Sequence, residues 1–374
     1  MLVIFSEILY ASSRERKNMP NQSQILGFDG SVRLAELFCG PGGIGLGASL
    51  ANADGLKIKH IWATDYDKDT CETYKKNLNP VDVLCEDIRK LDFAKVHKKY
   101  GDIDCLTFGF PCNDFSSVGE QKGLHGIFGA LYQYCVKALE EFKPKFFIAE
   151  NVSGLRNAND GEAFSRILEA FKNSGYEIYP NLYHFEEYGV PQKRHRVIIV
   201  GIRKDINLKF GIPSIKPYKK IDNSVKTALS NIPANAANNE LTAQSPIVVE
   251  RLKHIKEGEN AFTAKLPPEL QLNIAGAKIS QIYKRLKAGE PSYTITGSGG
   301  GGTHVYHYKE NRALTNRERA RLQTFTDNFV FVGSKESVRK QIGMAVPPRG
   351  IKIIFEALLN TILGNEYEIM DAKV

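Results

Sequence analysis

Short apolar runs alternate with helical segments over residues 31–203, and this alternation limits the possible folds more than any other feature. The runs of strand length are 33–39, 57–65, 81–87, 104–110 and 145–152. Segments with helical periodicity separate them, as in GALYQYCVKALEEF at 129–142. This order predicts an α/β fold in which helices cover both faces of a mostly parallel sheet.

The end of this region predicts a strand that runs against the others. A helix is expected over 161–175, followed by strands at 176–185 and 195–203. The connection between the two strands, EEYGVPQK, is short and polar, which suits an antiparallel pair. We therefore expect one antiparallel edge strand on the otherwise parallel sheet.

The composition changes after residue 203. Residues 203–290 hold 15 Lys and Arg against 8 Asp and Glu, so this segment carries nearly all of the net charge of +8. A basic excess is commonly a solvated face, but its concentration in one segment favours a polyanionic partner. The glycine-rich run at 294–304 predicts a hinge, although it could be linker alone.

The last part of the chain predicts a return to the first domain. A helix is expected to begin at Asn316, and a final helix carries apolar residues at helical spacing: Ile351, Ile354, Leu358 and Ile362. Packing of that helix on the first domain would make the domain discontinuous. We expect an extension at 1–30, a main domain at 31–203 and 305–374, and a smaller domain with a hinge at 204–304.

The cysteines argue against a metal site. All six lie in the first 135 residues, and they form no CxxC pair. No pair of histidines has zinc spacing either, so no metal is expected. Without a secretory signal, the cysteines are expected as free thiols in a reducing cytosol. No window of 18 apolar residues occurs, so no membrane contact is expected.

A glycine-rich loop and two carboxylates predict a nucleotide-like cofactor. Residues 40–45 read G-x-G-x-x-G between the first strand and a helix, where glycines let the backbone approach a ligand. The second strand ends at Asp65, which could accept hydrogen bonds from ribose hydroxyls, and Tyr66 could lie against a base. Asp87 ends the third strand. A nicotinamide dinucleotide and S-adenosylmethionine both fit these residues.

Reactive side chains are expected at the same edge of the sheet. Cys112 follows the fourth strand, after Pro111, and Glu150 comes at the end of the fifth. Arg194 and Arg196 are two apart, on one face of a strand. A nucleophile, an acid and two guanidinium groups beside a nucleoside site argue against a nicotinamide dehydrogenase, which explains neither the cysteine nor the glutamate.

Six segments, in order, resemble the C5-cytosine DNA methyltransferases. They are ELFCGPGG, GFPCNDFSSVG, ENVSGL, QKRHRVIIVGIR, RALTNRERARLQTF and KQIGMAVPP. The resemblance covers 31–203 and 294–364, about two-thirds of the chain. It implies a Rossmann-like, S-adenosylmethionine-dependent catalytic domain and a target-recognition domain at 204–304, with DNA between them.

The resemblance also implies roles for individual residues. The expected cofactor contacts are Phe38, Gly40, Gly42, Gly43, Asp65, Tyr66, Asp87, Ile88, Pro111 and Ala345. The expected catalytic residues are Cys112, Glu150, Arg194 and Arg196. Ser116 and Gln192 are expected at the DNA, and the loop 113–129 as a lid over the flipped base. Arg317 and Arg319 are expected to brace the fold, and His195 to face away from the site.

The chemistry explains why these residue types are needed. C5 of cytosine is too weak a nucleophile until a thiolate adds to C6. A free cysteine has a pKa of about 8.5, and neighbouring arginines could raise the thiolate share. Glu150 could protonate or hydrogen-bond N3 as charge develops there. Because C5 and C6 are buried in a duplex, the cytosine must be flipped out.

One position departs from the family, which usually has Asn where this chain has Met344. A thioether cannot hydrogen-bond comparably, which leaves the backbone of Ala345 for that contact. Two other functions are compatible with a chain of this fold. A tRNA cytosine methyltransferase of this fold would carry a Cys-Phe-Thr motif, but no cysteine follows Cys135. A silent DNA-binding subunit would have lost Pro-Cys or Glu-Asn-Val, and both are present.

The resemblance finally implies a biological setting. The cofactor would be S-adenosylmethionine, with S-adenosylhomocysteine as product and no metal. The partner would be double-stranded DNA, and the enzyme would act as a monomer paired with a restriction endonuclease. Its expected location is the bacterial cytoplasm, at the nucleoid.

Overall fold

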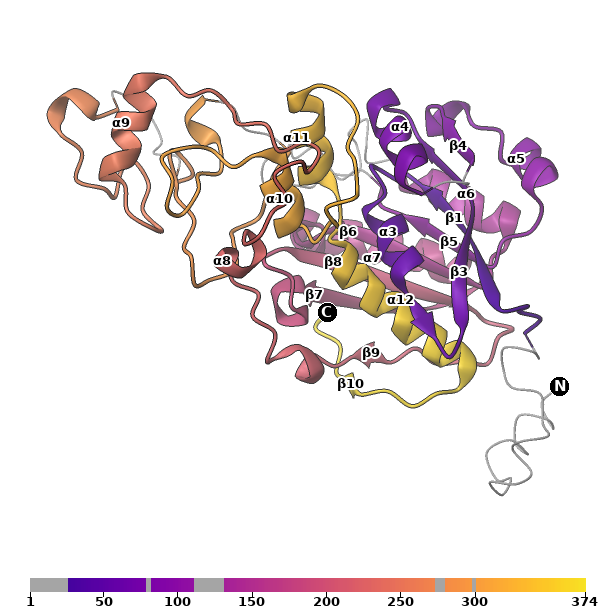
Figure 1. Cartoon of the computed structure of the whole chain (residues 1–374). Coiled ribbons are helices and arrows are strands. Elements are labelled where there is room, and N and C mark those ends of the chain that lie inside the picture. The colour runs from indigo at the N-terminus through magenta and orange to yellow at the C-terminus, as the bar shows by residue number, and fades with distance from the viewer. Residues whose placement is uncertain (1–25, 79–81, 111–130, 273–279, 298–300) are drawn as a thin grey trace.

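A mixed sheet forms the centre of the computed structural model, which describes residues 26–78, 82–110, 131–272, 280–297 and 301–374 (Figure 1). Its strands are β1 (Ser31–Leu37), β2 (Asn52–Ala53), β3 (Leu56–Asp65), β4 (Asp82–Cys85), β5 (Cys105–Phe108), β6 (Phe146–Val152), β7 (Tyr176–His184) and β8 (His195–Arg203). They lie in the order β2-β3-β1-β5-β6-β8-β7, and β4 pairs with β3. No helix in these ranges has the length and apolarity needed to cross a bilayer.

The sheet has the expected direction of strands. The pairings of β1 with β3 and β5, of β3 with β4, and of β5 with β6 are all parallel. Strand β8 is antiparallel to both β6 and β7. The predicted mostly parallel sheet with an antiparallel pair at its edge is therefore confirmed. Strand β8 lies one position inside the edge strand β7, and the two-residue strand β2 at the other edge is also antiparallel to its neighbour β3.

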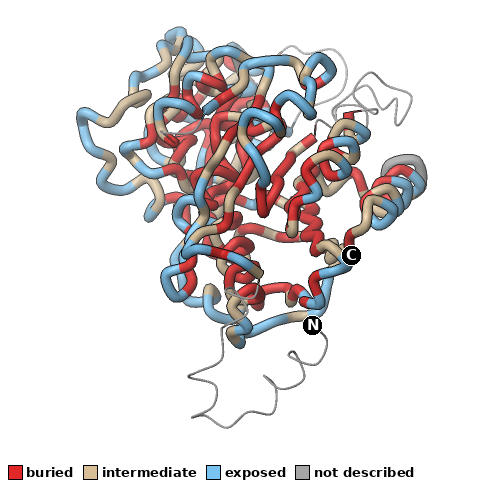
Figure 2. The backbone as a smooth tube through the Cα atoms, turned by 90° about the vertical axis from the view of Figure 1, so that its right-hand side faces the viewer, coloured by how far each residue is buried: buried red, intermediate tan, exposed pale blue. Residues whose placement is uncertain are grey.

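Successive side chains of the strands enter two different cores, as the alternation of a strand requires. One face packs on α3 (Gly43–Leu50) and α12 (Pro348–Leu363), and the other on α5 (Phe93–Tyr100), α6 (Tyr132–Phe142) and α7 (Glu162–Asn173). Ile148 and Ile198 belong to the first core, while Ala149 and Ile199 belong to the second. In Figure 2 the buried residues follow the strands and the inner sides of these helices.

The final helix α12 completes the first of these cores. Its predicted apolar residues, Ile351, Ile354, Leu358 and Ile362, are all fully buried. They share a core with Val32 of β1 and Ile44 of α3, so the end of the chain packs on its beginning. The segment after β8 joins the same core through Phe210. There β9 (Ile212–Pro213) pairs with β10 (Ile369–Met370). Packing thus extends the main domain beyond residue 203, the boundary we expected.

The remaining elements form a smaller body beside the sheet (Figure 1). Its helices are α8 (Val225–Ala228), α9 (Pro246–His254), α10 (Asn316–Leu322) and α11 (Lys335–Met344). A small core of its own includes Leu252, Ile282 and Tyr306. Another core joins α10 and α11 to α4 (Lys68–Asn77) of the main domain. The short 3-10 helices are η1 (Ile88–Lys90), η3 (Ser153–Gly161), η4 (Phe185–Tyr188), η5 (Lys216–Tyr218), η6 (Pro268–Leu270) and η7 (Gly301–Thr303).

Helix α10 begins at Asn316, as predicted, and is fixed by a capping box. Thr315 accepts a hydrogen bond from the Glu318 N–H, and the Glu318 carboxylate accepts one from the Thr315 N–H. Arg317 is fully buried and donates to the carbonyl oxygens of Ala237, Thr326 and Phe329. The expectation that Arg317 braces the fold is confirmed.

The glycine-rich segment before α10 is closely packed where the structure describes it. A Cβ atom on Gly343 of α11 would lie 1.9 Å from the backbone nitrogen of Gly297. We therefore expect Gly343→Ala to lower the free energy of unfolding by about 1–3 kcal/mol, because two backbones must separate. Gly289→Ala is the matched control, because a Cβ there meets nothing within 4 Å. It should change stability by less than about 0.5 kcal/mol in urea denaturation, and equal losses in both variants would contradict this account.

Candidate active site

A cavity of about 370 Å³ opens at the carboxyl ends of the parallel strands. The loops after β1, β3 and β5 line it, together with the end of β6, the residues around the start of β8 and one side of α11. Of the predicted site residues in the described part of the chain, those in its lining are Phe38, Gly40, Gly43, Asp65, Tyr66, Glu150, Arg194, Arg196 and Ala345. The structure therefore brings together residues that lie far apart in the sequence.

The loop after β1 reaches the cavity through unusual backbone angles. Phe38 has a φ of 51°, which is strained for a residue with a side chain, and Gly40 and Gly42 have φ of 55° and 98°. Gly42 is not in the lining; it begins α3 as its N-cap. The third glycine of the motif, Gly45, serves packing instead. A Cβ atom there would lie 2.7 Å from the Tyr74 hydroxyl.

Asp65 is held in place by the loop that it faces. Its carboxylate accepts hydrogen bonds from the N–H of Gly40 at 3.0 Å and of Asp67 at 3.1 Å. Burial raises its pKa, while these backbone hydrogen bonds oppose the rise. Tyr66 follows in the lining and is 64% exposed. A rigid carboxylate beside an open aromatic ring suits a ribose and its attached base.

Two of the expected cofactor contacts, Asp87 and Ile88, are not among the residues that line this cavity. The Asp87 carboxylate pairs with the guanidinium of Arg89 and caps η1, and these bonds lower its pKa to about 2. The side chain of Ile88 is buried in the core with α5 and α6.

Glu150 and Arg196 form an ion pair inside the cavity. The Arg196 Nε lies 2.9 Å from a carboxylate oxygen of Glu150, and each side chain is only 13% exposed. Burial raises the pKa of Glu150 above the usual value, and the attraction of Arg196 and Arg194 only partly offsets the rise. Gly109 leaves room for the carboxylate, since a Cβ atom there would lie 3.1 Å from it. Glu150 can therefore hold or give up a proton at this position.

Arg194 is fully buried, and its guanidinium donates to backbone carbonyl oxygens within the protein. It reaches Ile295 at 3.1 Å, Gly343 at 3.0 Å and Met344 at 3.4 Å. These bonds tie the start of β8 to α11 and to the segment before α10. The geometry gives Arg194 a positioning role, whereas Arg196 contacts the acid directly.

Gln192 does not lie where DNA could reach it, contrary to expectation. Its side chain is fully buried, and its amide NH₂ donates to Gln323 at 3.0 Å and to the Leu322 carbonyl at 3.3 Å. Its carbonyl oxygen accepts from the Ile295 N–H at 2.8 Å. Both ends of the amide are thus used to join the two bodies of the protein.

The predicted nucleophile Cys112 lies outside the described residues. The same is true of Pro111, of Ser116 and of the predicted lid at 113–129. The chain just before them is fixed, because Asn151 donates to the Phe110 carbonyl at 3.1 Å. Phe110 and Asn151 both line the cavity. In the sequence, Cys112 follows Phe110 by two residues.

Helix α11 supplies part of the cavity lining, including Met344, whose role the motifs left open. Met344 is 62% exposed there, and its carbonyl accepts from Arg194. The Ala345 N–H donates to the Gln341 carbonyl, and the Ala345 carbonyl accepts from Gln323, which leaves its second lone pair free to accept another hydrogen bond. Sequence reasoning missed Asp67, Thr70 and Ser337, which also line the cavity and carry no motif signal.

Comparison with known proteins finds similarity over most of the chain. The C-5 cytosine-specific DNA methylase family matches the chain over residues 32–360. Type II methyltransferase M.BbvI of Brevibacillus brevis is 52% identical over 353 residues, covering 91% of this chain and 94% of the relative. Type II methyltransferase M.NgoFVII of Neisseria gonorrhoeae is 42% identical over 346 residues, covering 91% and 89%.

Solved structures show the same architecture. A protein described as a DNA modification methyltransferase, encoded within a prophage in E. coli, aligns with a TM-score of 0.69 and 25% identity. The alignment covers 88% of this chain and 99% of that one. The methyltransferase EhMeth of Entamoeba histolytica aligns at a TM-score of 0.60 and 16% identity, over 88% and 98% of the two chains, which concerns the fold alone.

Proposed function

Since the chain belongs to the C-5 cytosine-specific DNA methylases, which are S-adenosylmethionine-dependent DNA cytosine-5 methyltransferases, we propose a covalent, base-flipping mechanism for it. One cytosine leaves the duplex, Cys112 bonds to its C6, and C5 receives the methyl group within a short specific sequence. The observation that carries this proposal is the buried Glu150–Arg196 pair, which shares its cavity with Phe110, two residues before Cys112 in the sequence.

The cofactor would occupy the part of the cavity formed by the first two strand ends. The buried carboxylate of Asp65, the turned backbone at Phe38 and the open ring of Tyr66 suit a nucleoside with its ribose. When bound, S-adenosylmethionine supplies an electrophilic methyl group on a sulfonium sulfur. The residues of this chain would hold the nucleoside and leave the side of the cavity at the ends of β5 and β6 for the base.

Cys112, Glu150 and a base such as water account for each bond formed or broken and for each proton transferred. The Cys112 thiolate forms a bond to C6 while Glu150 donates a proton or hydrogen bond to N3. The electron pair then available at C5 forms the new bond to the methyl carbon, whose bond to sulfur breaks. A base, such as water, removes the C5 proton, the C6–S bond breaks to restore the thiolate, and a proton given to N3 returns to Glu150. The raised pKa of Glu150 supports its role as the donor.

The direct test is incubation of the protein with labelled S-adenosylmethionine and plasmid DNA, followed by bisulfite sequencing. We expect label in DNA and protected cytosines at one recurring short sequence. Label in tRNA but not in DNA would favour the tRNA alternative, and no label in either would overturn the proposed activity.

We further propose that the outer lobe, residues 245–290, reads the DNA sequence. It contains α9, has its own small core, and exposes basic side chains such as Lys253, Lys256 and Lys265. Lysines there would bind phosphates, and polar neighbours would read base edges in the major groove. Residues 206–212 pack in the main core and are therefore left out of the proposed reader.

A chimera tests the reader. Exchange of residues 245–290 for the aligned segment of M.NgoFVII should change the methylated sequence while methyl transfer continues. Bisulfite sequencing of the same plasmid with both proteins measures this. As a control, the exchange of residues 93–100, which form the distant helix α5, should leave the target sequence as it was. An unchanged target in the first chimera would show that specificity lies elsewhere.

A further inference from the structure

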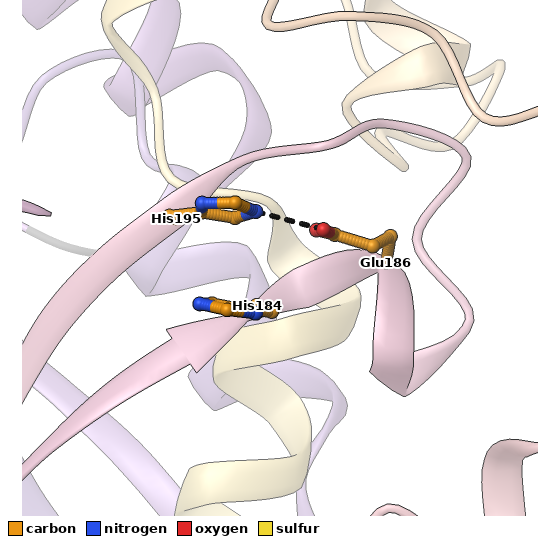
Figure 3. A group of neighbouring side chains, drawn as sticks. All are labelled: His184, Glu186 and His195. Atoms are coloured by element: carbon orange, nitrogen blue, oxygen red, sulfur yellow. Dashed lines mark hydrogen bonds and ion pairs between the residues drawn. The ribbon is translucent and has the colours of Figure 1, made fainter. Parts of the chain in front are cut away.

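Three side chains that can bind metal ions meet where β7 passes into β8 (Figure 3). His184 ends β7, Glu186 lies in η4, and His195 begins β8. The His195 Nε2 lies 2.7 Å from a carboxylate oxygen of Glu186, and the two imidazole rings stack with centroids 3.9 Å apart. One ligand atom from each residue lies within 4.8 Å of the others.

This group is separate from the active-site cavity. None of the three residues is in the cavity lining. His195 lies between Arg194 and Arg196 in extended chain, so its side chain points to the opposite side. The expectation that His195 faces away from the active site is confirmed.

Within the described residues, two members of the group, Glu186 and His184, have potential ligand atoms without a hydrogen-bond partner. Glu186 Oε2 is buried without a hydrogen bond, although burying a carboxylate oxygen in this way costs free energy. Within the described part of the chain, the ring nitrogens of His184 make no hydrogen bond either.

The local charges also fit a cation. The charge of Lys373 acts on His184, and its ammonium is paired with Glu187 at 2.6 Å. Coordination by His195 would replace its contact with Glu186 and leave the carboxylate charge to balance the ion. Two imidazoles and a carboxylate form a donor set typical of Zn²⁺, Ni²⁺ and Co²⁺.

We propose that His184, Glu186 and His195 bind one divalent transition-metal ion at the β7–β8 junction. Water would complete the coordination, and the two stacked imidazole rings would have to turn so that one nitrogen of each faces the ion. The ion would fasten η4 to the start of β8, the segment that carries Arg194 and Arg196, and would take no part in methyl transfer. The spacing His-x-Glu followed by a distant His matches no common zinc motif, so sequence inspection predicted no metal.

The test uses the whole protein, stripped with EDTA and then loaded with Co²⁺ or Zn²⁺. After gel filtration, we expect about one ion per chain by mass spectrometry. Bound Co²⁺ should show ligand-field bands without thiolate charge transfer. The His184→Gln and His195→Gln variants should each bind at least about 100-fold more weakly. Zn²⁺ should also raise the midpoint of thermal unfolding of the wild type but not of these variants.

Two controls separate this site from others. His254→Gln changes an exposed histidine that lies 3.9 Å from Glu250, and Cys85→Ser removes an exposed thiol. Both should bind the ion as the wild type does. If a histidine variant does not fold, Glu186→Gln tests the same site, because the amide keeps the shape and loses the charge. Metal content that survives in a folded Glu186→Gln or histidine variant, or that disappears in Cys85→Ser, would overturn the proposal.

Discussion

Substitution Cys112→Ser is expected to reduce methyl transfer to DNA by about 10³-fold or more. A serine hydroxyl is far less acidic than a thiol and is a poor nucleophile toward C6, so C5 would not be activated. Transfer of labelled methyl groups under single-turnover conditions measures the effect. The variant should still bind S-adenosylmethionine, because its proposed holders, such as Asp65, come from other loops.

A trapping experiment distinguishes loss of the nucleophile from loss of folding. DNA that carries 5-fluorocytosine at the target should form a stable covalent complex with the wild type, since fluorine cannot leave as the C5 proton does. The Cys112→Ser variant should form none. The exposed Cys85 provides the matched control, and Cys85→Ser should trap DNA normally. A covalent complex with Cys112→Ser would show that another residue is the nucleophile.

The second large effect is expected for Glu150→Gln, which should slow methyl transfer by about 10²–10⁴-fold. The amide cannot give a proton to N3, although it can still approach Arg196. Burial raises the pKa of Glu150, so the protonated form persists to higher pH than in a free glutamate and is lost as the pH rises through the folded-state pKa. The wild-type rate should therefore have a falling limb from Glu150 and a rising limb from deprotonation of Cys112.

The pH profile makes this prediction specific. In Glu150→Gln the falling limb should be absent, while the rising limb of the thiol should remain. Glu141→Gln is a suitable control, because Glu141 is an acidic residue of α6 that pairs with His97 away from the cavity. An unchanged falling limb in Glu150→Gln would assign that ionisation to another group and remove Glu150 from its role as the donor.

The sheet could be predicted from the sequence because each strand is a compact apolar run between clear helical segments. The predicted strands at 57–65 and 195–203 match β3 and β8 to within one residue. The position of β8 inside β7 could not be predicted, since it depends on pairing between distant segments. The packing of residues 206–212 in the main core was missed for the same reason, because a change in charge does not reveal a core contact.

Residues of the candidate site could be predicted where a polar side chain stands at the end of an apolar strand and is not needed for packing. Glu150 and Asp65 are polar side chains at the ends of apolar strands, so both were found. Gln192 and Arg194 stand in the same motif but are fully buried and bonded within the protein, which the motif could not reveal. Nor could the sequence show that the neighbouring Arg89 binds the carboxylate of Asp87 locally.

The burial of α12 beside α3 has a consequence for folding during synthesis on the ribosome. Ribosomal synthesis delivers the sheet and α3 long before α12, so Ile44 and Val32 remain without their native cover until the chain is nearly complete. Contacts of such long sequence separation slow folding and leave apolar surface open to aggregation meanwhile. Nascent chains stalled before residue 348 should therefore engage chaperones and resist compaction, and release of the full-length chain should end that dependence.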